Sequence, residues 1–297
     1  MTQKTGTPSN ILLYATTVLV WGVTWLGIKL QLEVVDPMVS VTYRFALAAA
    51  ILILYCRYRC FSMRFSLQQH AHIALQGMFL FSLNYLLIYL SEEWLTSGLV
   101  AVVFSSVMFM SIFNEALIFG TLPHATVVLG GVLGMAGIGT VFWPEIASLR
   151  ATSDTLTGLV LAILGTFSAS LGMITSAHNQ RRGLPVLQTN ALGMCYGAAL
   201  MAGLTIVLGR QFSIQPTVSY IGSLIYLAVF GSVVGFGAYL TLVGRIGPGR
   251  AAYSTLLVPL VALVISWAFE GYDWTWFTLI GVVLIIGGNM LVLNPRS

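Results

Sequence analysis

Long apolar stretches recur along the whole chain, and short polar or proline-containing segments separate them. A helix needs about 20 mostly apolar residues to cross the hydrocarbon core of a bilayer. The pattern therefore predicts ten transmembrane helices, near residues 11–29, 37–56, 70–90, 94–117, 124–143, 156–176, 185–208, 218–240, 248–269 and 274–293. Five prolines fall at or near the predicted starts, where a missing backbone N–H is tolerated: Pro37, Pro123, Pro185, Pro216 and Pro248.

Charged residues alternate between the predicted connections. With the N-terminus inside, the inner segments hold the basic residues Lys4, Arg57, Arg59, Arg64, Arg181, Arg182, Arg245, Arg250 and Arg296, and no clear acid. The outer segments hold Glu33, Asp36, Glu92, Glu93, Glu145, Asp154, Glu270 and Asp273, with Lys29, Arg150 and Arg210 as the basic residues. This bias follows the positive-inside rule. It predicts that both termini are cytoplasmic, and it explains the basic clusters by topology rather than by ligand binding.

The composition indicates the same class of protein. Of the 297 residues, 58% are hydrophobic and 7% are charged, and the mean hydropathy is +0.91. Soluble domains carry roughly 25% charged residues, so the solvent of this chain is a bilayer. Ten helices with short connections leave no room for a soluble catalytic or nucleic-acid-binding domain. The first apolar stretch is predicted to be a retained helix, and the three cysteines are predicted to be free thiols.

A shift of 150 positions brings several residues of the two halves into register. The matching pairs are Ser82 and Ser232, Tyr89 and Tyr239, Leu90 and Leu240, Ala101 and Ala251, Gly131 and Gly281, and Gly137 and Gly287. A shared register suggests a repeat, with residues 1–150 as the first five-helix unit and 151–297 as the second, within one membrane domain. Because five is odd, the second unit enters the membrane from the opposite side. Inverted repeats of this kind support alternating access.

Several motifs resemble the ten-helix drug/metabolite transporter superfamily, of the EamA type. They are an aromatic-Gly start with a Lys at the outer helix end (Trp21, Gly22, Lys29), then Pro37 and Arg44-Phe45, and in the second half Pro259, Glu270 and Gly281. The first half departs from the last pattern. Phe109 stands at the position of the Pro and Gly120 at that of the acid, while Gly131 is kept.

This resemblance implies a solute transporter, commonly an exporter, in the cytoplasmic (inner) membrane. It implies a central cavity built from the first, third, fourth, sixth, eighth and ninth helices. Within the superfamily the chain is most similar in general character to the bacterial aromatic amino acid exporters. We therefore expect export of amino acids and related small metabolites, with no cofactor, no metal and no nucleic acid partner. The oligomeric state stays open, and a monomer is compatible with this function.

Polar and aromatic residues within the predicted spans are the candidates for solute binding, because burying a polar group in hydrocarbon is unfavourable unless it has a partner. Trp21 and Trp25 lie one helical turn apart on one face, beside Thr24, and can stack on an aromatic or cationic solute. The full set is Trp21, Thr24, Trp25, Asn84, Tyr85, Ser105, Ser106, Tyr239, Tyr253, Ser254 and Thr255. The competing explanations are structural: lipid contact for the tryptophans, interhelical hydrogen bonds for the amide, and close packing for the hydroxyls.

Two charged residues within the spans remain to be explained. A structural role, bonding backbone carbonyls, is the favoured interpretation for Arg44. Glu115, near the inner end of the fourth helix, either couples protons or extends toward the inner surface, and the second interpretation is favoured. The small four-helix relatives that exchange protons for lipophilic cations use an acid in their first helix, and the first helix here contains none. This comparison disfavours proton-for-cation exchange and favours passive or otherwise coupled export of zwitterions, and a multidrug or lipophilic-cation exporter is the alternative. An intramembrane enzyme is disfavoured because all aspartates lie in loops and no H-E-x-x-H motif occurs. A channel or lipid scramblase shares the fold prediction.

Overall fold

Helices make up the regular structure in the described part of the chain. The computed structural model describes residues 9–31, 35–95, 97–147, 152–270 and 274–293. In the first half, the elements are α1 (Asn10–Lys29), α2 (Pro37–Tyr58), α3 (Leu67–Met78), η1 (Phe79–Leu83), α4 (Asn84–Glu92), α5 (Ser97–Ser105), α6 (Val107–Phe119), α7 (Ala125–Val141) and α8 (Trp143–Ala147). In the second half, they are α9 (Ser153–Arg181), α10 (Val186–Val207), α11 (Val218–Tyr226), η2 (Leu227–Val234), α12 (Gly235–Ile246), α13 (Pro248–Ala251), α14 (Ser254–Glu270) and α15 (Trp276–Leu293).

Eight helical stretches of the described chain are long and apolar enough to cross a membrane. Two shorter apolar helices, Ala125–Val141 and Trp276–Val292, accompany them. Each of the ten predicted ranges overlaps one of these segments. Two helices run well past their predicted ends: α12 continues to Ile246 rather than ending near residue 240, and α9 continues to Arg181 rather than ending near residue 176. Hydropathy misses this last turn because it contains Asn179, whose amide is buried and donates to Gln76 Oε1 at 3.0 Å.

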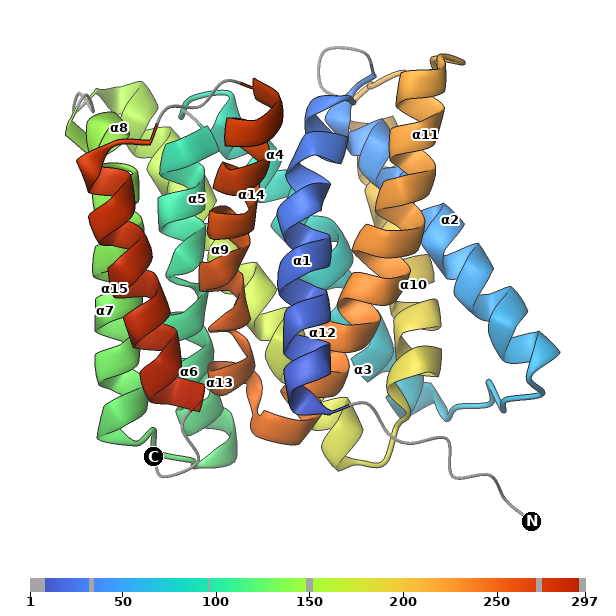
Figure 1. Ribbon diagram of the computed structural model, residues 1–297. Coiled ribbons are helices and arrows are strands. Elements are labelled where there is room, and N and C mark those ends of the chain that lie inside the picture. The colour runs from blue at the N-terminus through green and yellow to red at the C-terminus, as the bar shows by residue number, and fades with distance from the viewer. Residues whose placement is uncertain (1–8, 32–34, 96, 148–151, 271–273, 294–297) are drawn as a thin grey trace.

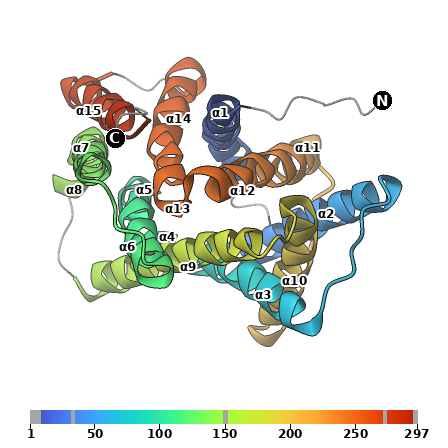
Figure 2. The same cartoon turned by 90° about the horizontal axis from the view of Figure 1, so that it is seen from below.

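The membrane-spanning helices form one layer, and their ends define its two faces. Figure 1 shows that α1 begins and α15 ends on the same face, which we call the lower face; the opposite one is the upper face. Seen from below, α2 packs on α10 at one end of the molecule and α7 packs on α15 at the other (Figure 2). Between these pairs, α1 and α11–α14 form one wall, which faces a second wall of α3–α6 and α9 (Figure 2).

Small residues allow several of these helices to touch through their backbones. A Cβ on Gly137 of α7 would lie 2.7 Å from the carbonyl oxygen of Gly281 in α15. A Cβ on Gly77 of α3 would lie 2.2 Å from the carbonyl oxygen of Gly193 in α10. Both distances are below van der Waals contact, so glycine is required at these crossings. Close approach through small residues is the usual way in which helices pack in lipid, where no hydrophobic force holds them together.

A π-helical segment interrupts each of two membrane-spanning stretches of the described chain, Leu67–Glu92 and Val218–Ile246. The first, η1, joins α3 to α4, and the second, η2, joins α11 to α12. Moving η1 forward by 150 residues places it at 229–233, inside η2. π-helical segments are rare and are frequent at functional sites. The two segments therefore mark equivalent positions in the two halves as places to look for a site.

Candidate functional site

A large cavity lies between the two walls of helices. The empty space inside it, including its open mouth, is ≈ 1120 Å³. Along α1, the residues that line the cavity begin at Trp21 and end at Ile28 in the last turn of the helix. On α4, the cavity extends to Glu92, also in the last turn. Both helices end at the upper face (Figure 1). The cavity therefore reaches from the middle of the layer to the upper face.

Aromatic rings form much of the wall. Trp21 packs against Phe236, with ring centroids 5.0 Å apart, and its indole N–H donates to the carbonyl oxygen of Gly231 at 3.1 Å. On the other side, the Tyr85 ring lies 5.0 Å from Phe45. The lining residues are Trp21, Thr24, Ile28, Arg44, Leu80, Asn84, Tyr85, Ile88, Tyr89, Glu92, Val100, Ala101, Phe104, Ser105, Met173, Phe236, Thr255, Val258 and Pro259. The surface is thus apolar and aromatic, with a few polar groups that can orient a solute.

Three hydroxyl groups on the cavity wall are committed as donors to their own helices. Thr24 donates to the carbonyl oxygen of Trp21 at 2.6 Å, Ser105 to that of Ala101 at 2.8 Å, and Thr255 to that of Ala252 at 2.6 Å. A hydroxyl has one proton and two lone pairs. These groups therefore offer hydrogen-bond acceptors to the cavity.

Six of the predicted site residues border the cavity: Trp21, Thr24, Asn84, Tyr85, Ser105 and Thr255. They come from α1, α4, α5 and α14, so the structure brings together residues far apart in the sequence. Their role in binding stays a prediction. Trp25 lies within α1, but its side chain is outside the described part of the structure.

Four predicted residues do not border the cavity, and the structure gives each of their hydroxyls a partner elsewhere. Tyr239 is fully buried and donates to Met173 Sδ at 2.9 Å. Tyr253 donates to the carbonyl oxygen of Val127, and Ser254 to that of Ala251. Ser106 donates to the carbonyl oxygen of Val103 at 2.6 Å. In each case the hydroxyl is turned into a helix or a helix contact, which is the structural explanation that competed with binding.

Several layers of contacts separate the cavity from the lower face. Beneath Trp21 and Phe236 lies the buried Tyr239, whose ring centroid is 4.9 Å from that of Trp21. Farther along α12, the carbonyl oxygen of Leu240 accepts from the Gln180 amide of α9 at 2.8 Å. This bond joins the two walls. The cavity is therefore closed toward the lower face.

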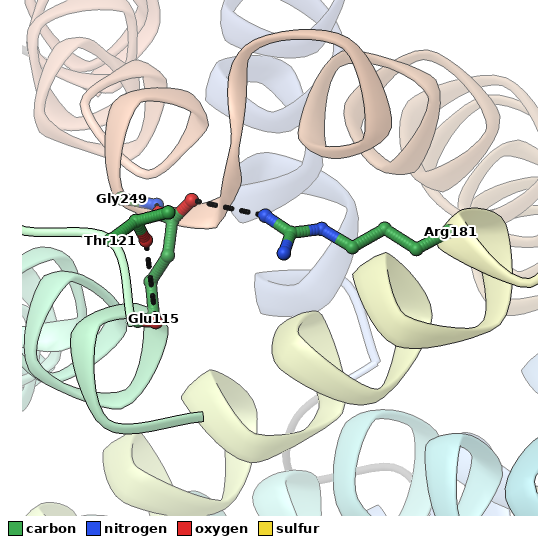
Figure 3. A network of polar contacts seen from close by, with 4 residues as sticks. All are labelled: Glu115, Thr121, Arg181 and Gly249. Atoms are coloured by element: carbon green, nitrogen blue, oxygen red, sulfur yellow. Dashed lines mark hydrogen bonds and ion pairs between the residues drawn. The ribbon is translucent and has the colours of Figure 1, made fainter. Parts of the chain in front are cut away.

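The lowest layer is built around the carboxylate of Glu115, at the end of α6 (Figure 3). Its Oε2 accepts from the backbone N–H of Gly249 at 2.8 Å, and its Oε1 lies 4.0 Å from an Nη atom of Arg181. The Arg181 guanidinium also lies 3.6 Å from the centroid of the Phe119 ring. Glu115 thus ties α6 to α13 and to the end of α9. The carboxylate lies at the lower side of the molecule, where the sequence predicts it, but it is held in these contacts and only 17% of the side chain is exposed.

Glycines make room for this carboxylate. Gly247, between α12 and α13, has φ = +88°, a region that favours glycine. A Cβ there would lie 2.6 Å from Glu115 Oε1, and a Cβ on Gly249 would lie 3.1 Å from Oε2. On the same lower side, Glu115 borders a second pocket of ≈ 590 Å³ between α6, α7, α12 and α13. The contact that closes the lower face is therefore closely packed, and the second pocket lies beside it.

The sequence matches the EamA-like transporter family twice, over residues 8–143 and 156–294. The chain belongs to the EamA-like transporter family. It is a multi-pass membrane protein of the transporter class, as the resemblance noted above predicted.

Known proteins similar to this EamA-like transporter include several bacterial ones. The "Uncharacterized inner membrane transporter YedA" of Escherichia coli is 25% identical over 256 residues, covering 85% of this chain and 80% of the relative. "Protein PagO" of Salmonella typhimurium is 23% identical, covering 96% and 93%. The "Probable amino-acid metabolite efflux pump" of Escherichia coli is 26% identical, covering 91% and 90%. A solved structure described as "Crystal structure of protein" has a TM-score of 0.82 at 17% identity over 96% of each chain, which shows the shared fold.

Sequence reasoning missed several residues that border the cavity of this transporter. Glu92 was assigned to an outer connection, yet it is the last residue of α4 and borders the mouth. Phe104 and Phe236 also border the cavity, and the sequence pattern does not distinguish them from other apolar residues of the spans. Arg44 was assigned a structural role, yet it borders the cavity. The signal available for Arg44 was its charge within a span, because an ionisable residue at that depth is a functional candidate by default.

Proposed function

We propose that this transporter exports amino acids, including aromatic ones, and related small metabolites across the inner membrane by alternating access through the central cavity. The observation that carries the proposal is the wall of the cavity, where aromatic rings stand beside hydrogen-bond acceptors and one buried cation. An aromatic amino acid presents the matching groups: a ring, an ammonium and a carboxylate. The relative named "Probable amino-acid metabolite efflux pump" supports the same substrate class.

We further propose that the protein has ten spans in two inverted five-helix repeats, 1–150 and 151–297. The family match in each half supports this, as do the two π segments in register. The packing supports it as well, because a two-fold axis that relates the halves brings together the equivalent helices that lie beside it. Two such pairs are in contact, α2 with α10 and α7 with α15. Likewise α1 packs on α12 and α14 while its equivalent, α9, packs on α4 and α6.

In this arrangement the lower face is cytoplasmic and both termini are inside. The basic residues of α9 and α12 support this orientation, since Arg181 and Arg245 lie in the last turns of helices that end at the lower face. The cavity then opens to the outside and is closed toward the cytoplasm. Alternating access requires a second conformation in which the Glu115 layer separates and the upper ends of α1, α4 and α14 meet.

A second candidate substrate class is supported by Glu92. An acid at the mouth of an aromatic cavity suits a lipophilic cation, which gains from both the carboxylate and the ring faces. One experiment compares the two classes. Proteoliposomes containing the purified transporter are loaded with radiolabelled phenylalanine or with radiolabelled tetraphenylphosphonium, and efflux is measured. Saturable phenylalanine efflux that competes with other amino acids supports the first proposal. Efflux of the cation without any amino acid flux would refute it.

A further inference from the structure

Arg44 is a buried cation without an acidic partner in the described part of the structure. Its exposed fraction is 4%, and no described carboxylate lies within 4.0 Å of it. Its Nε donates to Ser232 Oγ at 2.9 Å, and its guanidinium carbon lies 5.4 Å from the Phe45 ring centroid and 5.5 Å from that of Tyr85. Of its five N–H groups, the structure gives a hydrogen-bond partner among the described residues only to the one on Nε, and the side chain borders the cavity. An unpaired charge is unfavourable at this depth unless something compensates it.

The π segment η2 holds the guanidinium in place. Ser232 accepts from Arg44 and donates in turn to the carbonyl oxygen of Leu227 at 3.1 Å, five residues back as π-helical geometry allows. Gly231 provides the space beside it. A Cβ on Gly231 would lie 3.0 Å from Arg44 Nη2 and 2.9 Å from Thr24 Cγ2. Because Gly231 has no side chain, Arg44 and Thr24 can both lie against it on the cavity wall.

The other half of the protein lacks this arrangement. Ser82 in η1 is the repeat counterpart of Ser232, and it is buried with no hydrogen-bond partner for its hydroxyl. The residue that corresponds to Arg44 is Met194 in α10, which is packed in the apolar core. Helix packing alone does not require an arginine, because α10 lies against η1 without one. The cation is thus an addition to one half, at the wall of the cavity.

We propose that Arg44 binds the carboxylate of the exported solute, and that the Thr24 hydroxyl oxygen accepts from the ammonium on the adjacent carbon. The inference rests on the proposed function and specifies its binding site. A guanidinium offers parallel N–H groups that fit a carboxylate in two-point contact. Thr24 already donates to Trp21, so only its lone pairs are available, and these suit an ammonium. The aromatic residues of the cavity contact the side chain of the solute.

The test compares three ligands that differ only at the charged groups: phenylalanine, phenylalaninamide without the carboxylate, and 3-phenylpropionate without the ammonium. Binding to the purified full-length transporter is measured by calorimetry, and efflux is measured from proteoliposomes. We expect the wild type to bind phenylalanine and 3-phenylpropionate about 10- to 100-fold more tightly than phenylalaninamide, the range given by a charge-assisted two-point contact. Arg44→Gln should remove this difference, and Arg44→Lys should restore part of it. The matched control is Arg57→Gln, an exposed arginine on the same helix.

The outcomes separate this inference from the proposed function. Equal binding of phenylalanine and phenylalaninamide by the wild type overturns the role of Arg44, whether or not amino acids are exported. So does wild-type affinity for phenylalanine in Arg44→Gln. Binding of 3-phenylpropionate that depends on Arg44, without amino acid flux, supports the inference and rejects amino acid export. If Arg44→Gln does not fold, Gly231→Ala displaces the guanidinium instead, and the wild-type ligand series still decides.

Discussion

The closure at the lower face makes a quantitative prediction about Glu115. Replacing it with glutamine keeps an acceptor for the Gly249 N–H but removes the charge, and replacing it with alanine removes both. A hydrogen bond to a charged group contributes about 1.5–3 kcal/mol, roughly twice as much as a neutral one. The pair with Arg181 adds about 0–1 kcal/mol, because the Arg181 side chain is 49% exposed and the charges are screened.

We therefore expect Glu115→Gln to weaken the closed lower face by about 1–2 kcal/mol and Glu115→Ala by about 2–3 kcal/mol. These values correspond to a shift of roughly 5- to 30-fold and 30- to 150-fold toward the conformation open to the lower face. The difference between the two variants distinguishes charge from shape, because a purely steric effect would leave Glu115→Gln close to the wild type. Glutamine and glutamate have nearly the same shape.

The assay is labelling of an engineered cavity cysteine from each side of the membrane. The three native cysteines, which are free in the structure, are replaced first. Ser105→Cys then reports on the cavity, and a membrane-impermeant maleimide is applied to right-side-out or inside-out vesicles. Labelling from the lower face should accelerate in the order wild type, Glu115→Gln, Glu115→Ala. Glu93→Ala, at an exposed acid near the upper face, serves as the control. Unchanged labelling in Glu115→Ala would refute the role of this layer.

Three further predictions concern smaller changes. Gly249→Ala places a Cβ 3.1 Å from the Glu115 carboxylate and should accelerate labelling from the lower face, whereas Gly237→Ala, with nothing within 4 Å, should not. Gly137→Ala meets the α15 backbone at 2.7 Å and should lower the Tm by forcing the helices apart, at a free energy of about 1–3 kcal/mol. Gly139→Ala, with open space around it, should raise the Tm slightly through helix propensity. Trp21→Ala should reduce amino acid efflux without reducing expression; unchanged efflux would remove this ring from the binding surface.

The helices were predictable from the sequence because lipid selects long apolar stretches whatever their tertiary contacts. Their interruptions were not. The segment Phe79–Leu83 is apolar like many α-helical stretches of this chain, so nothing local distinguishes a π turn from an α turn. The last turn of α9 was also missed, since Asn179 reads as polar and its partner, Gln76, is distant in the sequence.

The candidate site was predictable only in part, for a related reason. Helical spacing groups residues by face, and this placed Trp21 and Thr24 together. It does not say which face turns to the cavity, so Tyr253 and Ser254 were included although both are packed against neighbours. Arg44 lies 188 residues from Ser232, the group that orients it. No local pattern connects two such residues, and the role of the arginine becomes visible only when α2 and η2 lie side by side.

The Glu115–Arg181 contact has no counterpart in the other half. The positions related to these residues by the 150-residue shift hold Ile265 and Gln31, which are uncharged. If the halves exchange conformations as proposed, the two states differ in energy and the empty carrier rests facing outward. Its return to the cytoplasmic side is then the slow step of the cycle. Solute supplied on the far side should speed that return, so efflux of label from the inside should accelerate when unlabelled solute is present outside.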